Sequence, residues 1–450
     1  MKQQLFIKKK GQPLYHQLYE YLKQQILDGY LVHQERLLSV RKAKEAYQLS
    51  HTSIIKAYEQ LLNEGLIEIK YKSGYYVCVN EQQRLLRQTM QQQQSLSLQD
   101  RIQYDLRSHS IDGSSFDIQI WNKCLKEALE SKHMEQYGDA QGEISLRIAL
   151  QKHAYTWRHV LCDIQQMIIG GSVQSLLFIL AGLLPRHYKI VMEEHAFLQA
   201  QLVFQQYGFE VITIQRIQHG IDIQALQKIK PDVLYINVNS CGTNYSELTY
   251  QEKQALIQYT KEHQIMMIED DHNGELNYRH ETSASMQSKC NEQVCYIGSF
   301  SRLLLPSIRI SYMILPTNIY QQYHALKSYY APSSSKVEQI ALTHYIIEGH
   351  MNRHIQRLQK HYYEKSIKFE QYLKQYFNDS IIILKEASFA YMIQSKQSIN
   401  MESLIHEANQ KGIKIEGKDH TLIIGFSSIQ EDEMEKVIQY LAKLWIKYQI

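Results

Sequence analysis

The chain has 450 residues, of which 44% are hydrophobic and 21% charged, and its 49 basic side chains nearly balance its 46 acidic ones. At roughly 100–200 residues per domain, this length predicts two to four domains, each with its own core. The 19 glycines and 6 prolines exclude a collagen-like or proline-rich disordered chain, and no apolar run reaches the ~18 residues of a membrane-spanning helix.

The N-terminal part of the chain carries the excess of positive charge. Residues 1–80 hold 12 Lys and Arg against 7 Asp and Glu, a balance of +5, whereas the whole chain is +3 and residues 81–450 therefore carry −2. A basic segment on a near-neutral body indicates an anionic partner for that segment.

The basic segment begins with three predicted helices. Apolar residues recur at helical spacing over 13–28. Ser39 is a good N-cap for a short helix that runs to Tyr47. Ser50 then caps a third helix, which ends at Gly65.

Two β-rich runs follow, 66–70 and 75–79, and predict a hairpin, so that residues 1–80 read as a winged helix-turn-helix. In such a domain the recognition helix enters the major groove and the wing lies near the phosphates. The residues that we expect to contact DNA are polar, cationic or on the wing: Ser39, Arg41, Lys42, Ser50, His51, Thr52, Ser53, Lys56, Lys72, Gly74 and Tyr75. The alternative is a protein-docking module whose lysines are merely solvated.

Four segments in this region resemble, in order and spacing, the DNA-binding domain of GntR-type bacterial transcription regulators: PLYHQLYEYLKQQIL, ERLLSVR, TSIIKAYEQLLNEGLIE and KSGYYV. The resemblance covers nearly all of residues 12–78. Two residues depart from the family pattern, Leu38 in place of Pro and His51 in place of Arg. The histidine change should weaken phosphate contacts, because neutral His lacks the permanent charge and the fork of Arg.

After the predicted winged helix-turn-helix, a glutamine-rich stretch at 81–104 predicts a linker. Apolar runs then alternate with helical stretches such as 249–263, which predicts a mostly parallel α/β sheet in a large domain at 105–380. A long helical stretch at 336–376 precedes a small α+β domain at 381–450. The runs that we expect to form strands are 189–192, 210–214, 233–238, 265–269, 294–299 and 309–315.

Residues 105–450 resemble an aminotransferase of fold type I through YGDAQGEISLR, MIIGGSVQSL, IMMIEDDHNGEL, SFSRLLLPSIRISYMILP and LIIGFSS. Joined to a GntR-type head, this arrangement is similar to the MocR/GabR regulators, which are dimers that use a pyridoxal-phosphate fold as an effector sensor. By this resemblance Asp270 holds the pyridine nitrogen and Phe197 stacks on the ring. The family's phosphate-binding positions fall on Ser299, Ser301 and Arg309.

The same resemblance places the Schiff-base lysine at Arg302, and no lysine occurs anywhere in 299–316. A guanidinium stays protonated and cannot act as the amine nucleophile, so we expect no transamination and no covalently bound cofactor. By the same resemblance, His272 replaces the tyrosine that contacts the ring oxygen. Ile423 replaces the arginine that binds a substrate carboxylate, and Ser172 replaces a glycine. The segment NVNSCGTN at 237–244 has likewise lost the family pattern.

Two uses of the altered pocket remain open. It holds pyridoxal phosphate or another anionic ligand non-covalently, with Arg302 adding charge beside Arg309. Alternatively, Arg302 pairs with Asp270 or Asp271 in an empty pocket, and the fold serves only for dimerisation. His272 and His195 are the titratable side chains expected nearest this cleft, and no ligand spacing supports a metal at either.

Together these features predict a homodimeric regulator that binds double-stranded operator DNA and is catalytically inactive; a small anionic effector is a further partner in the first of the two uses of the pocket, and absent in the second. The alternatives are a pyridoxal-phosphate-dependent aminotransferase or pyridoxal-phosphate-sensing regulator, and a protein-binding scaffold. The six scattered cysteines lack metal spacing, and the N-terminus MKQQLFIKKK has no apolar core before a cleavage site. We therefore expect reduced thiols, no metal, no membrane association and a cytoplasmic location.

Overall fold

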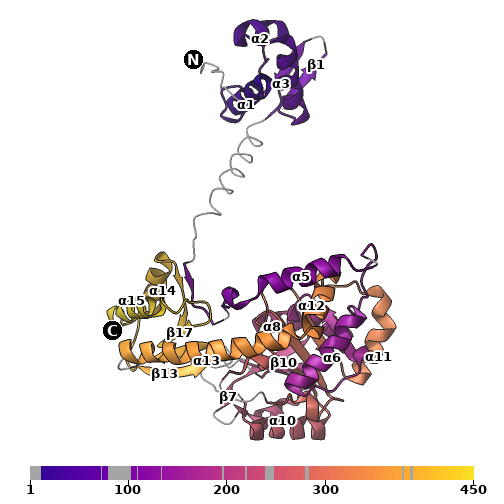
Figure 1. Cartoon of the computed structure of the whole chain (residues 1–450), viewed down its shortest axis with the longest axis vertical. Coiled ribbons are helices and arrows are strands. Elements are labelled where there is room, and N and C mark those ends of the chain that lie inside the picture. Colours follow the sequence, from indigo (N-terminus) through magenta and orange to yellow (C-terminus); the bar gives the residue numbers. More distant parts are fainter. Residues whose placement is uncertain are drawn as a thin grey trace. The chain divides into compact units, whose positions relative to one another are not determined.

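The computed structural model describes residues 12–71, 73–79, 103–108, 110–132, 134–194, 197–217, 220–238, 248–278, 283–377, 380–385 and 389–449. The chain divides into two compact units, residues 1–101 and 102–450 (Figure 1). None of the helices in these ranges combines the length and apolarity that crossing a membrane requires.

The smaller unit contains three helices and a hairpin, which confirms the predicted winged helix-turn-helix. Its elements are α1 (Leu14–Leu27), α2 (Val40–Tyr47), α3 (His51–Asn63), β1 (Ile67–Lys70) and β2 (Gly74–Val77). The Ser39 hydroxyl accepts a hydrogen bond from the amide of Lys42 at 3.4 Å, and that of Ser50 accepts one from Ser53 at 3.2 Å. Both serines therefore cap the helices that they were predicted to cap.

The core of this unit joins all of its elements. Leu18 of α1, Ile54 and Leu61 of α3 and Val77 of β2 are fully buried in one cluster. Tyr58, also in this cluster, donates its hydroxyl to the carbonyl of Leu38 at 2.9 Å. This bond fixes the chain just before α2, at the position where the family pattern has proline.

The larger unit is built on a seven-stranded sheet in the order β4-β12-β11-β10-β9-β5-β6. The pairs from β11 to β6 are parallel, whereas β12 runs antiparallel to β11 and β4, so the mostly parallel sheet is confirmed. The strands are β4 (Met167–Gly170), β5 (Lys189–Glu193), β6 (Glu210–Ile214), β9 (Val233–Asn237), β10 (Met266–Asp271), β11 (Val294–Ser299) and β12 (Ser311–Ile314). Strand β4 was not among the predicted strands.

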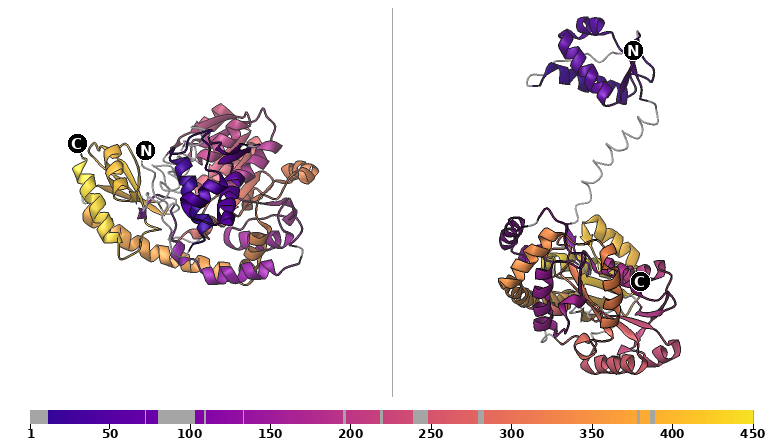
Figure 2. Two further views of the ribbon diagram at one scale, coloured as in Figure 1. Left: turned by 90° about the horizontal axis from the view of Figure 1, so that it is seen from above. Right: turned by 90° about the vertical axis from the view of Figure 1, so that its right-hand side faces the viewer.

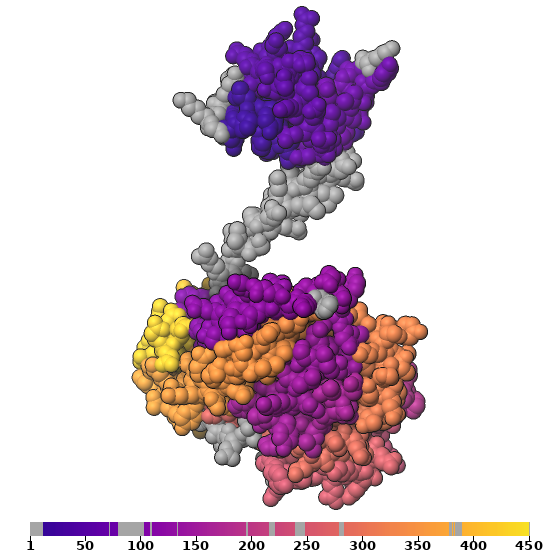
Figure 3. All heavy atoms as spheres, turned by 45° about the vertical axis from the view of Figure 1, so that its right-hand side comes forward, coloured from indigo at the N-terminus to yellow at the C-terminus, as the bar shows by residue number. Residues whose placement is uncertain are grey.

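Helices cover both faces of this sheet. Alternate strand residues enter different cores: Tyr312 and Ile314 pack with α6, α12 and α13, whereas Met313 packs with α7, α8 and α11. The helices are α5 (Ile118–Leu129), α6 (Ile144–Arg158), α7 (Val173–Leu183), α8 (Leu198–Gln206), α9 (Ile223–Ile229), α10 (Tyr250–His263), α11 (Thr317–Leu326), α12 (Lys336–Ile347) and α13 (His350–Tyr376). In Figure 3 the purple α5–α6 segment and the orange α12–α13 segment share one face.

The long helical stretch predicted at 336–376 is confirmed and consists of two helices. Gly349 separates α12 from α13 and adopts a left-handed φ of +75°. This conformation is favourable for glycine and ends a helix. The break lets α13 run from the large sheet to the C-terminal elements, where it meets α15 (Figure 2).

The C-terminal part carries a second sheet in the order β13-β14-β17-β16. Its elements are β13 (Ile381–Lys385), β14 (Ala390–Gln394), α14 (Met401–Gln410), β15 (Ile413–Lys414), β16 (Glu416–Lys418), β17 (Thr421–Gly425) and α15 (Met434–Lys447). Strand β3 (Tyr104–Asp105) pairs in parallel with β15, so the chain joins this part directly after the predicted linker, most of which lies outside the described residues.

A buried ion pair ties α6 to the end of β10. Arg158 contacts the Asp271 carboxylate through Nε at 2.5 Å and Nη2 at 3.2 Å, and the side chains are 2% and 0% exposed. Tyr296 donates its hydroxyl to the same carboxylate at 2.7 Å. Removing one partner would leave a buried charge without compensation.

We therefore expect Arg158→Met to lower the free energy of unfolding by about 3–5 kcal/mol, and Arg158→Met/Asp271→Asn to lower it by less. Urea unfolding of the full chain, followed by the transition of the larger unit, measures both. Equal losses in the single and double variants would show that the pair does not act as a unit.

Candidate functional site

The first candidate surface is the exposed start of α3 in the smaller unit. His51 and Thr52 are exposed in the first turn, and Ser53 is half-buried, with its hydroxyl 2.8 Å from that of Ser50. The first amides of a helix lack intrahelical acceptors and carry partial positive charge. This end of α3 therefore offers hydrogen-bond donors and a favourable field to a phosphate or a base edge.

Cations flank this end of α3. Arg41 and Lys42 are exposed on the first turn of α2, next to its cap at Ser39. Lys56 is exposed on α3, and its ammonium lies 5.7 Å from the centre of the Tyr15 ring. That cation–π contact orients the lysine without neutralising it.

Tyr75 of the wing is half-buried. Its ring packs edge-on against Tyr58 at 4.8 Å between centroids, so part of this side chain lies against the core of the domain. Gly74 has a φ of +117°, and Nε of Arg36 lies 3.5 Å from where a Cβ would stand. Lys72 lies outside the described residues.

Arg36 is a candidate that sequence reasoning missed. It is exposed, and a bridge to Tyr76 holds its backbone beside β2. The only signal was a basic residue three positions before the cap at Ser39, in ERLLSVR. Its place beside the wing depends on a pairing across 40 positions of chain, which local patterns do not reveal.

The second candidate site begins with three consecutive buried carboxylates at the end of β10: Glu269, Asp270 and Asp271 are 0%, 3% and 1% exposed. Ligands of parallel α/β sheets bind at this carboxyl edge. Glu269 accepts the backbone amides of Met286 at 2.9 Å and Gln287 at 2.8 Å, and burial raises its pKa to about 7. Asp271 is held by Arg158.

Asp270 keeps an unused acceptor. Tyr235 of β9 donates its hydroxyl to Oδ2 of Asp270, whereas Oδ1 is buried and has no hydrogen-bond partner among the described residues. Burial raises the pKa of Asp270 to about 7, with a smaller rise from Asp271 and an opposing effect of the Tyr235 bond. This oxygen can accept a bond from a protonated ring nitrogen or another donor.

Arg302 is buried, at 9% exposure, and does not pair with either aspartate. Its Nη2 donates to the carbonyl of Ser108, its guanidinium lies 5.5 Å from the centre of the Phe389 ring, and Nη1 has no partner within the described part of the chain. Burial lowers the pKa of Arg302 to about 10. The ion pair proposed for the empty-pocket alternative is therefore wrong, because Arg158 already neutralises Asp271 and Tyr235 bonds Asp270.

His272 follows the three carboxylates. Burial and the positive charge of Arg302 lower its pKa to about 3, against a smaller opposing effect of Asp271. The imidazole is therefore neutral at physiological pH and provides one donor and one acceptor. His195, which was also expected near this cleft from the sequence, lies outside the described residues.

The residues expected at a phosphate lie in two groups. The hydroxyl of Ser299, at the end of β11, lies 3.2 Å from that of Ser301 and 3.3 Å from that of Ser311, the first residue of β12. Arg309 is exposed, and its carbonyl accepts the Ser334 hydroxyl at 3.2 Å.

The loop between β4 and α7 comes close to this carbonyl, since a Cβ on Gly171 would lie 3.8 Å from it. Ser172 caps α7 and exchanges hydrogen bonds with Ser175. Phe197 is half-buried at the start of α8 and packs on the core beneath the sheet.

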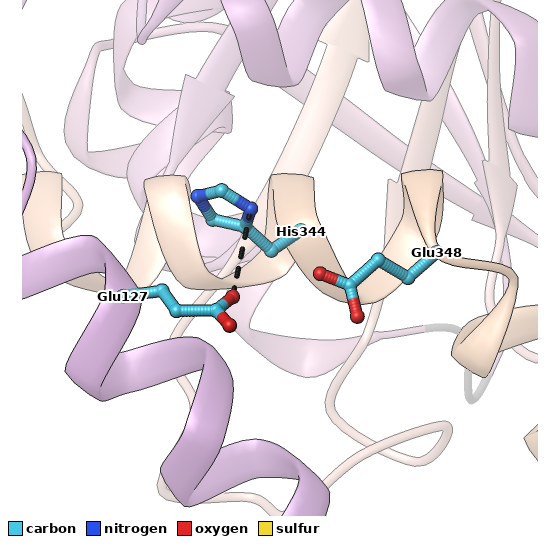
Figure 4. A group of neighbouring side chains, drawn as sticks. All are labelled: Glu127, His344 and Glu348. Carbon is cyan, nitrogen blue, oxygen red and sulfur yellow. Dashed lines mark ion pairs between the residues drawn. The ribbon is translucent and has the colours of Figure 1, made fainter.

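One group has the geometry of a metal site, Glu127, His344 and Glu348, shown in Figure 4. Nδ1 of His344 lies 3.9 Å from Glu127. The ammonium of Lys123 lies 3.5 Å from Glu127 and 3.2 Å from Glu348, so the cation between these carboxylates belongs to the chain itself. The group is an ion-pair network that joins α5 to α12.

Comparison with known families divides the chain at the same place as its two units. The family described as "Bacterial regulatory proteins, gntR family" matches residues 14–77, and "Aminotransferase class I and II" matches residues 103–431.

Similar proteins span the whole chain. The uncharacterized HTH-type transcriptional regulator YdeL of Bacillus subtilis (strain 168) is 28% identical over 96% of this chain and 97% of its own length. The probable rhizopine catabolism regulatory protein MocR of Rhizobium meliloti is 23% identical, over 96% and 94%. The HTH-type pyridoxine biosynthesis transcriptional regulator PdxR of Corynebacterium glutamicum is 21% identical, over 94% of each chain.

Solved structures share the fold of the larger unit. A multiple substrate aminotransferase from Thermococcus profundus superposes with a TM-score of 0.67 at 18% identity, over 80% of this chain and 94% of that one. An archaeal alanine:glyoxylate aminotransferase gives 0.69 at 17% identity, over 80% and 95%. These similarities establish the fold-type I aminotransferase architecture.

The raised pKa of Asp270 predicts that this residue lowers the free energy of unfolding as pH rises. Its ordinary pKa is about 4. Below that value the carboxyl is protonated in both the folded and the unfolded protein, whereas above about 7 the folded protein must bury the charge. Asp270→Asn, which still accepts the Tyr235 hydroxyl, should therefore gain stability relative to the native chain as pH rises from about 4 to about 7. Urea unfolding at pH 5 and pH 8 tests this, and a pH-independent difference would contradict it.

Proposed function

Because the chain belongs to the aminotransferase class I and II family and carries a gntR-type winged helix ahead of that domain, as MocR-type regulators do, we propose that it is a DNA-binding transcription regulator without aminotransferase activity. The observation that carries this proposal is Arg302. It stands at the position that the family resemblance gives to the imine-forming lysine, and it is buried, cationic and bonded to Ser108.

The fit of pyridoxal phosphate to this pocket is only partial. Asp270 offers a free buried oxygen for a protonated ring nitrogen, and the serines at the end of β11 offer hydroxyls for a phosphate. The segment 299–316 contains no lysine that could form an imine, however. The two buried lysines in the described ranges are engaged elsewhere, Lys253 with Ser283 at 3.0 Å and Lys365 with Ser427 and Asp112 at 2.6 and 3.4 Å. The residues therefore do not fit a covalently held cofactor.

In this proposal the larger unit forms the dimer and senses a small anion non-covalently. Among the described residues, Nη1 of the buried Arg302 and Oδ1 of Asp270 have no hydrogen-bond partner. A ligand with an anionic group and a protonated ring nitrogen would satisfy both. Non-covalent pyridoxal phosphate has these groups, and a relative named as a pyridoxine biosynthesis regulator supports such an effector.

DNA reading is assigned to the smaller unit. The polar start of α3 would contact base edges, whereas Arg41, Lys42 and Lys56 would contact phosphates. We add Arg36 to the phosphate contacts because it is exposed beside the wing. Dimerisation would bring two winged helices to paired half-sites.

Removing the charge of Lys56 should weaken binding to every promoter fragment to a similar degree, because phosphate contacts are independent of sequence. We expect the slope of log K against log salt concentration to fall by about one unit in Lys56→Ala and Arg36→Ala. Fluorescence anisotropy with a labelled duplex at several salt concentrations measures this slope. Lys396→Ala, an exposed lysine of the other unit, is the control. If Lys56→Ala and Arg36→Ala both kept the salt slope of the native chain, the assignment of these residues to phosphate contacts would be contradicted.

The loss of imine chemistry is tested with pyridoxal phosphate and borohydride. The native chain should give no coloured adduct and no peptide in 299–316 fixed by reduction, because residue 302 offers no free amine. Arg302→Lys, which supplies that amine, should form the adduct, whereas Arg302→Gln should not. A stoichiometric adduct on any lysine of the native chain would refute the inactive assignment.

A further inference from the structure

A cavity of about 330 Å³ lies in the C-terminal part of the larger unit, between β3 with β15 and helix α15. Its apolar floor includes Ile413 and Val437, which are 4% and 3% exposed. This volume is at the lower end of the range of ligand sites, roughly 300–1,000 Å³, and suits a metabolite rather than a peptide.

Three lysines surround this floor. Lys436 and Lys443 are seven residues apart on α15, and therefore share a helix face, while Lys411 follows α14. All three are exposed, and none of their ammonium groups has a hydrogen bond or ion pair within the described parts of the chain. The lining contains no acidic residue.

The nearest carboxylates are hydrogen-bonded to other groups, although Glu407 also acts electrostatically on Lys411. Glu433 accepts the Tyr104 hydroxyl at 2.6 Å, and Glu407 accepts Lys447 at 2.6 Å. The cavity therefore combines local positive charge with an apolar floor.

Tyr440 supplies an independent observation. It lines the cavity between the two helix lysines, and its hydroxyl oxygen is buried without a hydrogen-bond partner among the described residues. Burial raises the pKa of this phenol, so the group stays a donor at neutral pH. Buried donors normally have an acceptor, so a ligand acceptor that reached this hydroxyl would satisfy it.

We propose that this cavity binds a small organic dianion with an apolar body, held by Lys411, Lys436 and Lys443 and by the hydroxyl of Tyr440. A ligand at this site would also affect the segment that leads to the winged helix-turn-helix. Gln103 and Tyr104 donate their amides to the carbonyl of Gly412 at 2.9 and 3.0 Å, directly after residues 80–102. A ligand bridging β15 and α15 stabilises this attachment of β3 and so acts on DNA binding, a step that rests on the proposed function.

The test uses the full chain and isophthalate, an aromatic dianion, with malonate as the dianion that lacks the ring. Isothermal titration should show one saturable isophthalate site per chain and weaker binding of malonate. Lys436→Ala/Lys443→Ala should weaken isophthalate binding at least about tenfold, while Lys418→Ala, an exposed lysine outside the lining, should leave it unchanged.

Tyr440→Phe keeps the ring and removes only the unpartnered hydroxyl. It should weaken isophthalate binding by a few-fold while leaving the unfolding temperature unchanged or higher, because a buried donor without an acceptor is removed. Amide exchange at Tyr104 and Leu106 should slow when isophthalate binds.

Two results would overturn the proposal: no saturable isophthalate binding, or native affinity in the double lysine variant. DNA affinity is measured separately on the same preparations. Absence of binding to every promoter fragment would overturn the proposed function, while saturable, lysine-dependent isophthalate binding would still support the cavity as a site.

Discussion

The organisation of the larger unit depends on the protein groups that hold three adjacent buried carboxylates at the end of β10. Each is compensated by a different part of the chain: Glu269 by the amides of residues 286 and 287, Asp270 by Tyr235 of β9, and Asp271 by Arg158 of α6. Burying a charge is costly unless it is paired and hydrogen-bonded, so these contacts fix the elements that provide them. These contacts hold the carboxyl edge of the sheet in place through three separate parts of the chain.

This arrangement determines the surroundings of Arg302. Because the strongest nearby acceptor, Asp271, is already saturated by Arg158 and Tyr296, Arg302 turns to a backbone carbonyl and an aromatic ring. Ser108 follows β3 and Phe389 precedes β14, so the guanidinium joins the large sheet to both segments of the C-terminal part. The side chain at the position that the family resemblance gives to the imine-forming lysine thus links these parts of the larger unit, which supports the proposal that the chain has no aminotransferase activity.

Features that depend on local sequence were predictable, whereas those that depend on distant partners were not. The caps at Ser39 and Ser50 and the apolar strand runs follow from spacing over a few residues. The bond between Arg158 and Asp271 joins positions 113 residues apart, and no local pattern identifies which of two adjacent aspartates an arginine will choose. The break at Gly349 did have a local signal, a glycine within the helical stretch, which the prediction did not use.

The two cationic sites of the larger unit place different demands on a ligand. Arg302 is buried, and its Nη1 has no partner among the described residues. A ligand acceptor would offset the desolvation cost of that nitrogen, and the affinity there should depend little on salt. The three lysines around the C-terminal cavity are exposed to solvent, so leaving their charges unpaired costs little free energy. A ligand therefore gains Coulomb energy there only after it displaces water and counterions. Its apolar body must then supply much of the binding free energy by covering Ile413 and Val437. For this reason the cavity should select ligands by their apolar body as much as by their charge, whereas the cleft at Arg302 should select the placement of an acceptor.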